Sequence, residues 1–126
     1  MTASTSQAYT ELPVTWASRT ESPDGRTSPE ELVASAHAAC FAMAVSHGLG
    51  QAGTPPEKLE VSATVTFGQV KGGWKVASSA LNVRGRVPGI DSAGFQKAAD
   101  AAKGGCPISE ALKGNVDLSV QVTLEN

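Results

Sequence analysis

The longest apolar segment of the sequence, residues 28–53, predicts one long helix. Ser28 is a favoured N-cap residue, Pro29 suits the first helical position, and Glu31 completes an S-x-x-E capping box. Gly48 and Gly50 mark the far end of the predicted helix, and Gly53 with the Pro55-Pro56 pair is the stop signal. About 20 residues lie between these signals, so the predicted helix is roughly 30 Å long.

The predicted helix is apolar on every side. Between Leu32 and Ser46 only His37 can carry a charge. The expected core stripe comprises Leu32, Val33, Ala36, Ala39, Cys40, Met43 and Ala44. A helix that is apolar all round is typically buried all round. Because a chain of 126 residues rarely surrounds such a helix alone, the pattern predicts that a second subunit helps to cover it.

Two-residue alternation of apolar and polar side chains predicts three strands after the helix. The clearest strand is residues 59–67, and residues 74–87 return from it through a tight turn at Gly72-Gly73. The alternation of the second strand changes phase near residues 78–80, which predicts a β-bulge there. The third strand covers residues 116–124.

The start of the chain is less regular. Residues 1–8 are expected to be flexible. Residues 9–16 alternate weakly and predict a short strand, which Pro13 places near a sheet edge. Residues 17–27 are polar around a Pro-Asp-Gly turn signal, so we expect a surface loop that leads into the long helix.

Two shorter helices are predicted between the second and third strands. Asp91 or Ser92 caps a helix over residues 93–103, which two glycines end. Cys106 then starts a short helix with proline at its first position. The predicted order is β-α-β-β-α-α-β, an α+β fold with a mostly antiparallel sheet, in a single domain over residues 1–126.

Composition and charge narrow the classes of function. Charged residues make up 17% of the chain and aromatic residues 5%, so the core is expected to consist largely of Ala and Val. The net charge is −2 and the basic residues form no stripe, so a nucleic acid partner is not expected. The first residues lack the apolar run of a signal peptide, and polar residues interrupt the long helix. We therefore expect a cytoplasmic protein without a membrane span.

The two cysteines, Cys40 and Cys106, are the main candidates for chemistry. In a reducing cytoplasm such a pair is typical of catalysis, redox chemistry or metal binding rather than of a structural disulfide. A helix start or a nearby cation stabilises the reactive thiolate, so Cys106 is locally the better placed and Cys40 needs a cation from elsewhere. If the fold brings them together, they can form a disulfide, as in the resolving step of a thiol peroxidase. Otherwise Cys40 is an ordinary small core residue.

Two other residues remain open at this point. His37 stands three positions before Cys40, and with Cys106 the two would make a three-ligand zinc site, although no fourth ligand accompanies them. Glu31 serves as the capping residue, so Glu30 is free for another role.

Two segments resemble the OsmC/Ohr family, the osmotically inducible protein C and organic hydroperoxide resistance proteins. PEELVASAHAACFAMAVSHGLGQAG is similar to the family's central helix, and VPGIDSAGFQKAADAAKGGCPISEAL to its second conserved segment with the GCP-[IV]-S signature. The resemblance covers roughly residues 9–126, and AHAACF is closer to the OsmC branch. Family members usually carry an additional N-terminal strand pair. The resemblance implies an OsmC-like fold, an intertwined homodimer with active sites at the subunit interface, and a thiol-dependent peroxidase that reduces organic hydroperoxides.

The resemblance also implies roles for individual residues. Cys40 corresponds to the peroxidatic cysteine, Cys106 to the resolving cysteine, and Glu30 to the active-site glutamate. The catalytic arginine belongs to the loop before the helix, where Arg19 fits best by distance and Arg26 is the alternative. An external dithiol, either a lipoyl-bearing protein or a small thiol, would reduce the disulfide, and no metal, haem or flavin cofactor is implied.

One geometric expectation follows from the residues. Glu30 and Cys40 are ten positions apart, which is about 15 Å along a helix axis. If Glu30 serves Cys40, it is therefore expected to come from the partner subunit.

Apolar residues expected near the site, which would favour alkyl or fatty hydroperoxides, are Phe41, Met43, Phe95 and Ile108. The alternatives are a non-catalytic stress-protein dimer, a metal-binding regulator and a redox sensor that uses the same cysteines.

Overall fold

The computed structural model describes residues 12–126. The predicted flexible segment 1–8 and the first part of the predicted strand 9–16 lie outside the described residues, and the single domain over residues 1–126 stays a prediction. The helices and strands are α2 (Trp16–Thr20), α3 (Pro29–Gln51), β1 (Lys58–Val70), β2 (Gly73–Arg86), α4 (Ser92–Ala102), α5 (Pro107–Leu112) and β3 (Asp117–Leu124).

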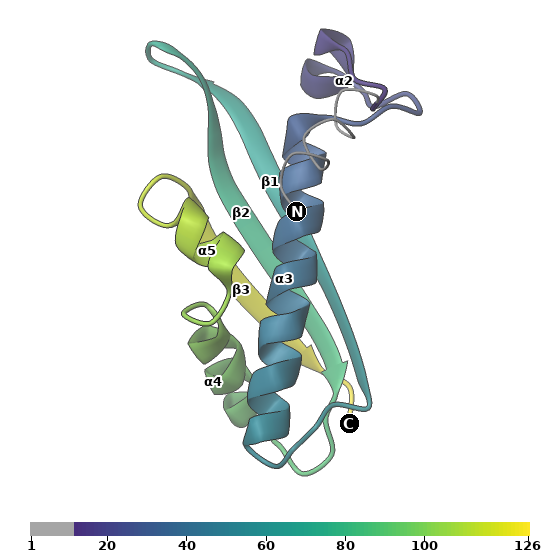
Figure 1. The fold of residues 1–126 in the computed structure, drawn as a ribbon, viewed down its shortest axis with the longest axis vertical. Helices are drawn as coiled ribbons and strands as arrows, with labels where there is room; N and C mark the ends of the chain where they lie inside the picture. Colours follow the sequence, from purple (N-terminus) through teal and green to yellow (C-terminus); the bar gives the residue numbers. More distant parts are fainter. Residues whose placement is uncertain (1–11) are drawn as a thin grey trace, which may run out of the picture.

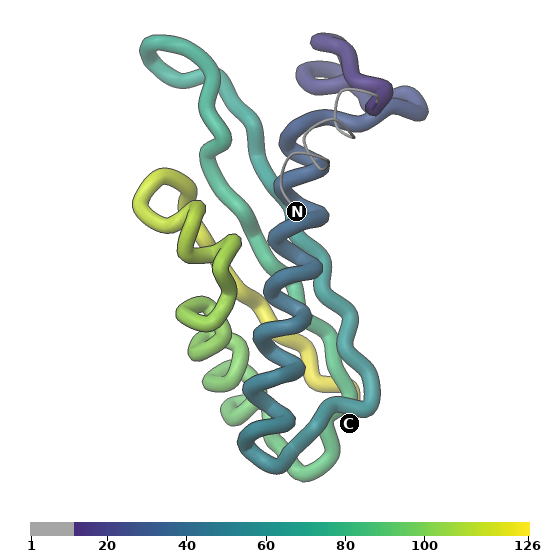
Figure 2. Tube along the Cα trace, viewed as in Figure 1, coloured from purple at the N-terminus to yellow at the C-terminus, as the bar shows by residue number. Residues whose placement is uncertain are grey.

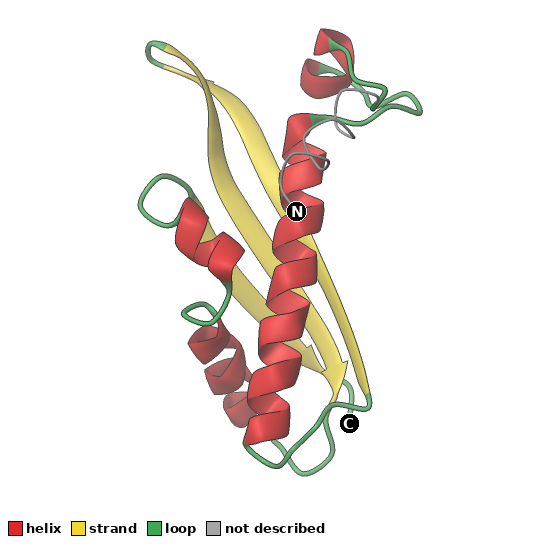
Figure 3. Ribbon diagram, viewed as in Figure 1, coloured by secondary structure: helices red, strands yellow, loops and turns green. Residues whose placement is uncertain are grey.

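The fold has two layers, a three-stranded sheet and a layer of helices on one of its faces (Figures 1 and 3). The strand order is β1-β2-β3. Helix α3 lies over β1 and β2, and α4 lies over β3 (Figure 1). In the second half of β2 and along β3, every second side chain lies on the opposite face of the sheet and is exposed to solvent. The α+β class predicted from the sequence is therefore confirmed.

The expectation of a mostly antiparallel sheet is only half right. Strands β1 and β2 pair antiparallel, but β3 pairs parallel to β2, with Ser78 opposite Asp117. A parallel neighbour needs a crossover connection, whereas an antiparallel one needs only a tight turn. Here α4 and α5 form that crossover and carry the chain back along β2, so that β3 starts beside Ser78 and runs in the same direction as β2 (Figure 2).

The β1–β2 hairpin matches its sequence signals. Gly72 and Gly73 have φ angles of 96° and 145°, values that residues with a side chain rarely adopt, so the turn requires glycine here. The pairing register shifts between Thr66 and Phe67, whose partners are Ser78 and Val76, so Ala77 is the extra residue of a bulge. The predicted bulge is thus present, directly before the predicted residues 78–80.

The structure corrects the prediction for residues 12–27. The chain enters helix α2 at Trp16, because the Thr15 hydroxyl accepts the Ser18 N–H at 3.0 Å and the Ser18 hydroxyl accepts the Thr15 N–H at 2.9 Å. This capping box outweighs the weak alternation that predicted a strand. In the described part of the predicted strand, residues 12–16, the only strand pairing is an isolated bridge between Val14 and Thr27, and the predicted loop 17–27 begins as a helix.

Helix α3 begins and ends close to the predicted residues. The Ser28 hydroxyl accepts the Glu31 N–H at 3.1 Å, and Pro29 occupies the first turn. Among the described residues the return bond from the Glu31 side chain is not present, so only half of the predicted capping box forms. By length and hydropathy alone α3 would pass as a membrane-crossing helix, a test that core helices also pass.

The buried face of α3 differs from the predicted stripe. The core side chains come from Phe41, Val45 and Leu49, with His37 and Glu30 on the same side. Ala36 and Ala39 are exposed, and Met43 is 74% exposed. Because α3 is apolar on all sides, its sequence singles out no core face, and packing against the sheet decides which one is buried. Within one chain the opposite face of this apolar helix remains uncovered.

The sheet and the helices meet closely at Gly85, which gives a stability prediction. A Cβ atom at Gly85 would lie 2.9 Å from the Phe95 ring and 3.1 Å from Leu59 Cδ1. Gly85→Ala is therefore expected to lower the free energy of unfolding by about 1–3 kcal/mol through overpacking. Equilibrium urea unfolding measures the change. The matched control is Gly68→Ala in β1, where a Cβ meets nothing within 4 Å. Equal effects of the two substitutions would contradict the packing argument.

Candidate active site

The two cysteines, 66 positions apart in the chain, lie next to each other in the structure. Cys40 is half-buried in the middle of α3, and Cys106 is fully buried at the N-cap of α5. Both thiols are free, and they lie close enough for each to shift the pKa of the other. The fold therefore meets the condition for disulfide formation that the sequence left open.

The surroundings of the two thiols shift their pKa values in opposite directions. The backbone hydrogen bond from Ile108 lowers the pKa of Cys40, but burial, the hydrogen bond with Cys106 and the charge of Cys106 together raise it above its ordinary value. Burial raises the pKa of Cys106, but hydrogen bonds from the Ser109 side chain and backbone, from Cys40 and from Ile108 bring it below its ordinary value. No cation of residues 12–126 contributes to the shift at Cys40. Within one chain Cys106 is therefore the more acidic thiol, as its helix-start position predicted.

Arg19 and Glu30 form a bidentate ion pair at the start of α3. Arg19 Nε donates to Glu30 Oε1 at 2.6 Å, and its Nη2 donates to Oε2 at 3.0 Å. The Glu30 side chain is only 8% exposed. The Arg19 guanidinium also stacks over the Phe67 ring of β1, with Cζ 4.3 Å from the ring centroid. These contacts hold the guanidinium in one orientation.

This ion pair does not lie beside Cys40 of the same chain. Glu30 precedes Cys40 by ten positions on the unbroken α3, about 15 Å along the axis. Of the two arginines considered, Arg19 binds Glu30, whereas Arg26 is exposed in the loop before α3. The structure thus brings together Cys40 with Cys106, and Arg19 with Glu30, as two separate groups.

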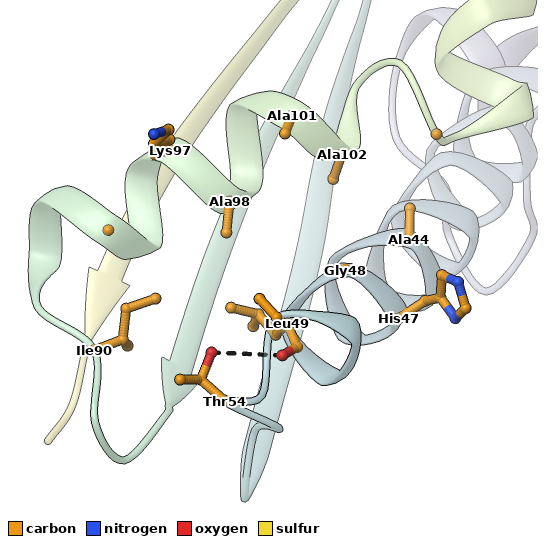
Figure 4. A pocket seen from close by; sticks show the side chains of 13 residues that line it. Ala44, His47, Gly48, Leu49, Thr54, Ile90, Lys97, Ala98, Ala101 and Ala102 are labelled. Atoms are coloured by element: carbon orange, nitrogen blue, oxygen red, sulfur yellow. Dashed lines mark hydrogen bonds between the residues drawn. The ribbon is translucent and has the colours of Figure 1, made fainter.

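An apolar groove of about 480 Å³ runs between the second half of α3 and α4 (Figure 4). Ala44 lies on the α3 side and Ala98 and Ala102 on the α4 side, while Ile90 and Thr54 lie at the end of the groove away from Ala44 and Ala102 (Figure 4). Ala44 follows Cys40 by one helical turn, and the lining residue Gly105 immediately precedes Cys106. The groove therefore leads towards the cysteine pair.

The four apolar residues expected near the site lie in different environments. Phe41 and Phe95 are fully buried core residues, Met43 is exposed, and Ile108 is half-buried with its backbone bonded to Cys40. Sequence reasoning missed the small residues of the groove, because alanine and glycine carry no chemical signal. It also assigned no role to Ser109, although Ser109 is the serine of the GCP-[IV]-S signature.

The described residues offer no cluster for a metal. Within residues 12–126 no group of three or more His, Cys, Asp or Glu side chains is placed to hold a metal ion. His37 Nδ1 lies 2.7 Å from Ser79 Oγ and Nε2 lies 2.8 Å from Ser109 Oγ, so both ring nitrogens already have hydrogen-bond partners.

This fold and site define an α+β protein with a paired-thiol centre between a long central helix and a short second helix. The chain belongs to the OsmC family: the profile described as OsmC-like protein matches residues 22–121.

Known proteins of two branches are similar to the chain. It is 43% identical over 96 residues to peroxiredoxin OsmC of Escherichia coli (strain K12), over 76% of this chain and 67% of that protein. It is 35% identical over 95 residues to the organic hydroperoxide resistance protein of Xanthomonas axonopodis pv. citri (strain 306), over 75% of this chain and 65% of that protein. The chain thus spans about two thirds of the length of these relatives.

A solved structure supports the same assignment. The organic hydroperoxide resistance protein OhrB of Bacillus subtilis superposes with a TM-score of 0.71 at 28% identity, over 85% of this chain and 76% of that one. The OsmC-like fold expected from the sequence is therefore confirmed, and identity is higher to the OsmC relative than to the Ohr relative, as expected.

Proposed function

We propose that the protein is a thiol-dependent peroxidase that reduces organic hydroperoxides through a disulfide between Cys40 and Cys106. The observation that carries the proposal is the contact between these two free thiols, on elements that are far apart in sequence. The names of its relatives, a peroxiredoxin and organic hydroperoxide resistance proteins, support a peroxidase-type role.

The proposed cycle assigns one step to each cysteine. The Cys40 thiolate attacks the terminal peroxide oxygen and the O–O bond breaks. The alkoxide leaves as the alcohol after taking up the proton that the Cys40 thiol released. Cys40 is then a sulfenic acid, and Cys106 displaces its hydroxyl as water to form the disulfide. An external dithiol, from a lipoyl-bearing protein or a small thiol, exchanges with this disulfide and restores both thiols. The reductant and the cytoplasmic location stay predictions.

In this proposal the cation that Cys40 needs comes from a second subunit. Cys40 has a raised pKa in the single chain, so it requires a positive charge to react as a thiolate at neutral pH. The Arg19–Glu30 pair is fixed but distant from Cys40 of its own chain. The uncovered apolar side of α3 supports a homodimer in which two α3 helices pack antiparallel and bring this pair to the partner's Cys40.

The apolar groove between α3 and α4 supports the substrate class. It would take the alkyl part of the hydroperoxide while the peroxide group meets Cys40. Hydrogen peroxide has no alkyl part and gains nothing from this groove.

A peroxide-consumption assay tests the function. Purified protein with dihydrolipoamide is expected to consume cumene hydroperoxide over many turnovers, and about 10-fold or more faster than hydrogen peroxide. A disulfide that forms once but is not turned over by dihydrolipoamide or dithiothreitol would indicate the redox sensor instead. Stoichiometric zinc in the purified protein would favour the metal-binding alternative. Equal rates with the two peroxides would overturn the role of the groove.

A further inference from the structure

His37 is a polar side chain in the middle of the core, and the proposed cycle does not use it. The side chain is 0% exposed, and its ring meets the Phe41 ring edge-on, with 6.4 Å between the ring centroids. Burial lowers the pKa of His37, which keeps the ring neutral at physiological pH. A neutral imidazole has one N–H donor and one acceptor nitrogen, so it can link two hydroxyl groups directionally.

Hydrogen bonds connect His37 to the resolving thiol. Its Nε2 lies 2.8 Å from Ser109 Oγ. The Ser109 backbone N–H donates to the Cys106 sulfur at 3.4 Å, and the Ser109 side chain lies close enough to lower the pKa of Cys106. At the other end of the ring, Nδ1 lies 2.7 Å from Ser79 Oγ on β2. One chain of contacts thus runs from the sheet through α3 to the N-cap of α5.

Counting hydrogens assigns the direction of this chain when Cys106 is a thiolate. With the proton on Nε2, Ser79 Oγ–H donates to Nδ1 and Nε2–H donates to Ser109 Oγ, which leaves the Ser109 Oγ–H free to donate to the sulfur. Every hydrogen then has an acceptor. With the proton on Nδ1, the Ser109 hydroxyl must donate to Nε2 instead, and its bond to the thiolate is lost. The Ser79 hydroxyl would then have no acceptor among the hydrogen bonds of the described residues.

We propose that His37 is a positioning residue for the resolving cysteine: its Nε2–H holds the Ser109 hydroxyl in the orientation that donates to Cys106 and stabilises the thiolate. The proposal rests on the proposed function for the role of Cys106, but the hydrogen-bond chain is independent of that function. The direction of the Cys106 pKa, lowered in part by the Ser109 side chain, agrees with it.

The chain acts in the second step of the cycle. The Cys106 thiolate attacks the Cys40 sulfur of the sulfenic acid, an S–S bond forms and the S–O bond breaks. The hydroxide leaves as water with the proton that Cys106 released. The Cys106 sulfur is oxidised and the Cys40 sulfur reduced, so no further oxidant is needed after the hydroperoxide. Ser109 donates to the attacking sulfur, and His37 acts only through Ser109.

Two isosteric variants separate positioning from packing. In the His37→Gln variant the side-chain amide nitrogen lies near the former position of Nε2 and can still donate to Ser109. In the His37→Asn variant the shorter side chain places its amide nitrogen near the former position of Nδ1, beside Ser79. In a Cys40→Ser background, ultraviolet absorbance of the thiolate measures the pKa of Cys106. We expect Ser109→Ala and His37→Asn to raise this pKa, and His37→Gln to restore it towards its value without a His37 substitution.

With Cys40 present, one equivalent of cumene hydroperoxide separates the two steps in a stopped-flow experiment. Ser109→Ala and His37→Asn are expected to slow disulfide formation about 10-fold or more, while sulfenic acid formation keeps its rate. Equal effects of Gln and Asn, or an unchanged Cys106 pKa in Ser109→Ala, would overturn the proposal. The Cys106 titration needs no peroxidase activity, so failure of the proposed function would appear only in the turnover assay.

Discussion

Replacing Cys40 by serine is expected to abolish turnover of organic hydroperoxides, by on the order of 10³-fold or more, because a hydroxyl in place of the thiolate does not attack peroxide oxygen at neutral pH. Cys106→Ser is expected to behave differently. It should react with one equivalent of hydroperoxide and stop, because the sulfenic acid on Cys40 then has no neighbouring thiol. Peroxide consumption with dihydrolipoamide measures turnover, and labelling with dimedone followed by mass spectrometry detects the trapped sulfenic acid.

The pair of variants also decides which cysteine reacts first. Within one chain Cys106 has the lowered pKa and Cys40 the raised one, so the opposite assignment is chemically reasonable. If Cys40→Ser carried the dimedone label on Cys106 after one equivalent of hydroperoxide, Cys106 would be the peroxidatic residue. Turnover in Cys40→Ser would reject the proposed cycle altogether. The wild-type protein is the control for both variants.

Mixed dimers are expected to be active when Glu30→Gln is in one subunit and Cys40→Ser is in the other. One of the two sites then combines an intact Cys40 with an intact Arg19–Glu30 pair from its partner, so about half of the activity should remain. A dimer with both substitutions in one subunit and a wild-type partner is expected to be nearly inactive. There one site lacks the thiol and the other lacks the carboxylate that holds the guanidinium.

The reverse pattern would show that each site is built within one chain. Two different affinity tags on co-expressed subunits allow isolation of the mixed dimers, and peroxide consumption is measured on both. Arg19→Ala in place of Glu30→Gln should give the same pattern, because Arg19 and Glu30 are paired within one chain. Arg26→Ala in place of Glu30→Gln is the matched control. Both dimers should then keep about half of the activity, since Arg26 is exposed and not bonded to Glu30. A strictly monomeric protein in solution would refute the shared site.

Much of the site could be named from the sequence but not assembled from it. The cysteines and Glu30 stand in motifs, and Arg19 was preferred over Arg26 on distance alone. Their partners depend on elements distant in the chain: Cys106 reaches Cys40 only after the crossover through α4 and α5, and Phe67 lies under Arg19 because β1 runs back along α3. His37 looked like a metal ligand or a plain histidine, and its serine partners lie 42 and 72 positions away.

By itself the sequence determined the elements whose cause is local. The Ser28 cap, the glycine turn after β1, the Asp91 cap of α4 and the alternation of β1 and β3 act over a few residues, and each element lies where these signals predicted. Tertiary structure alone decided which side of the uniformly apolar α3 is buried and that β3 runs parallel to β2. The physical reason is range. Caps and turns satisfy backbone hydrogen bonds within one segment. Packing and strand pairing depend on contacts between segments that are distant in the chain and meet only in the folded protein.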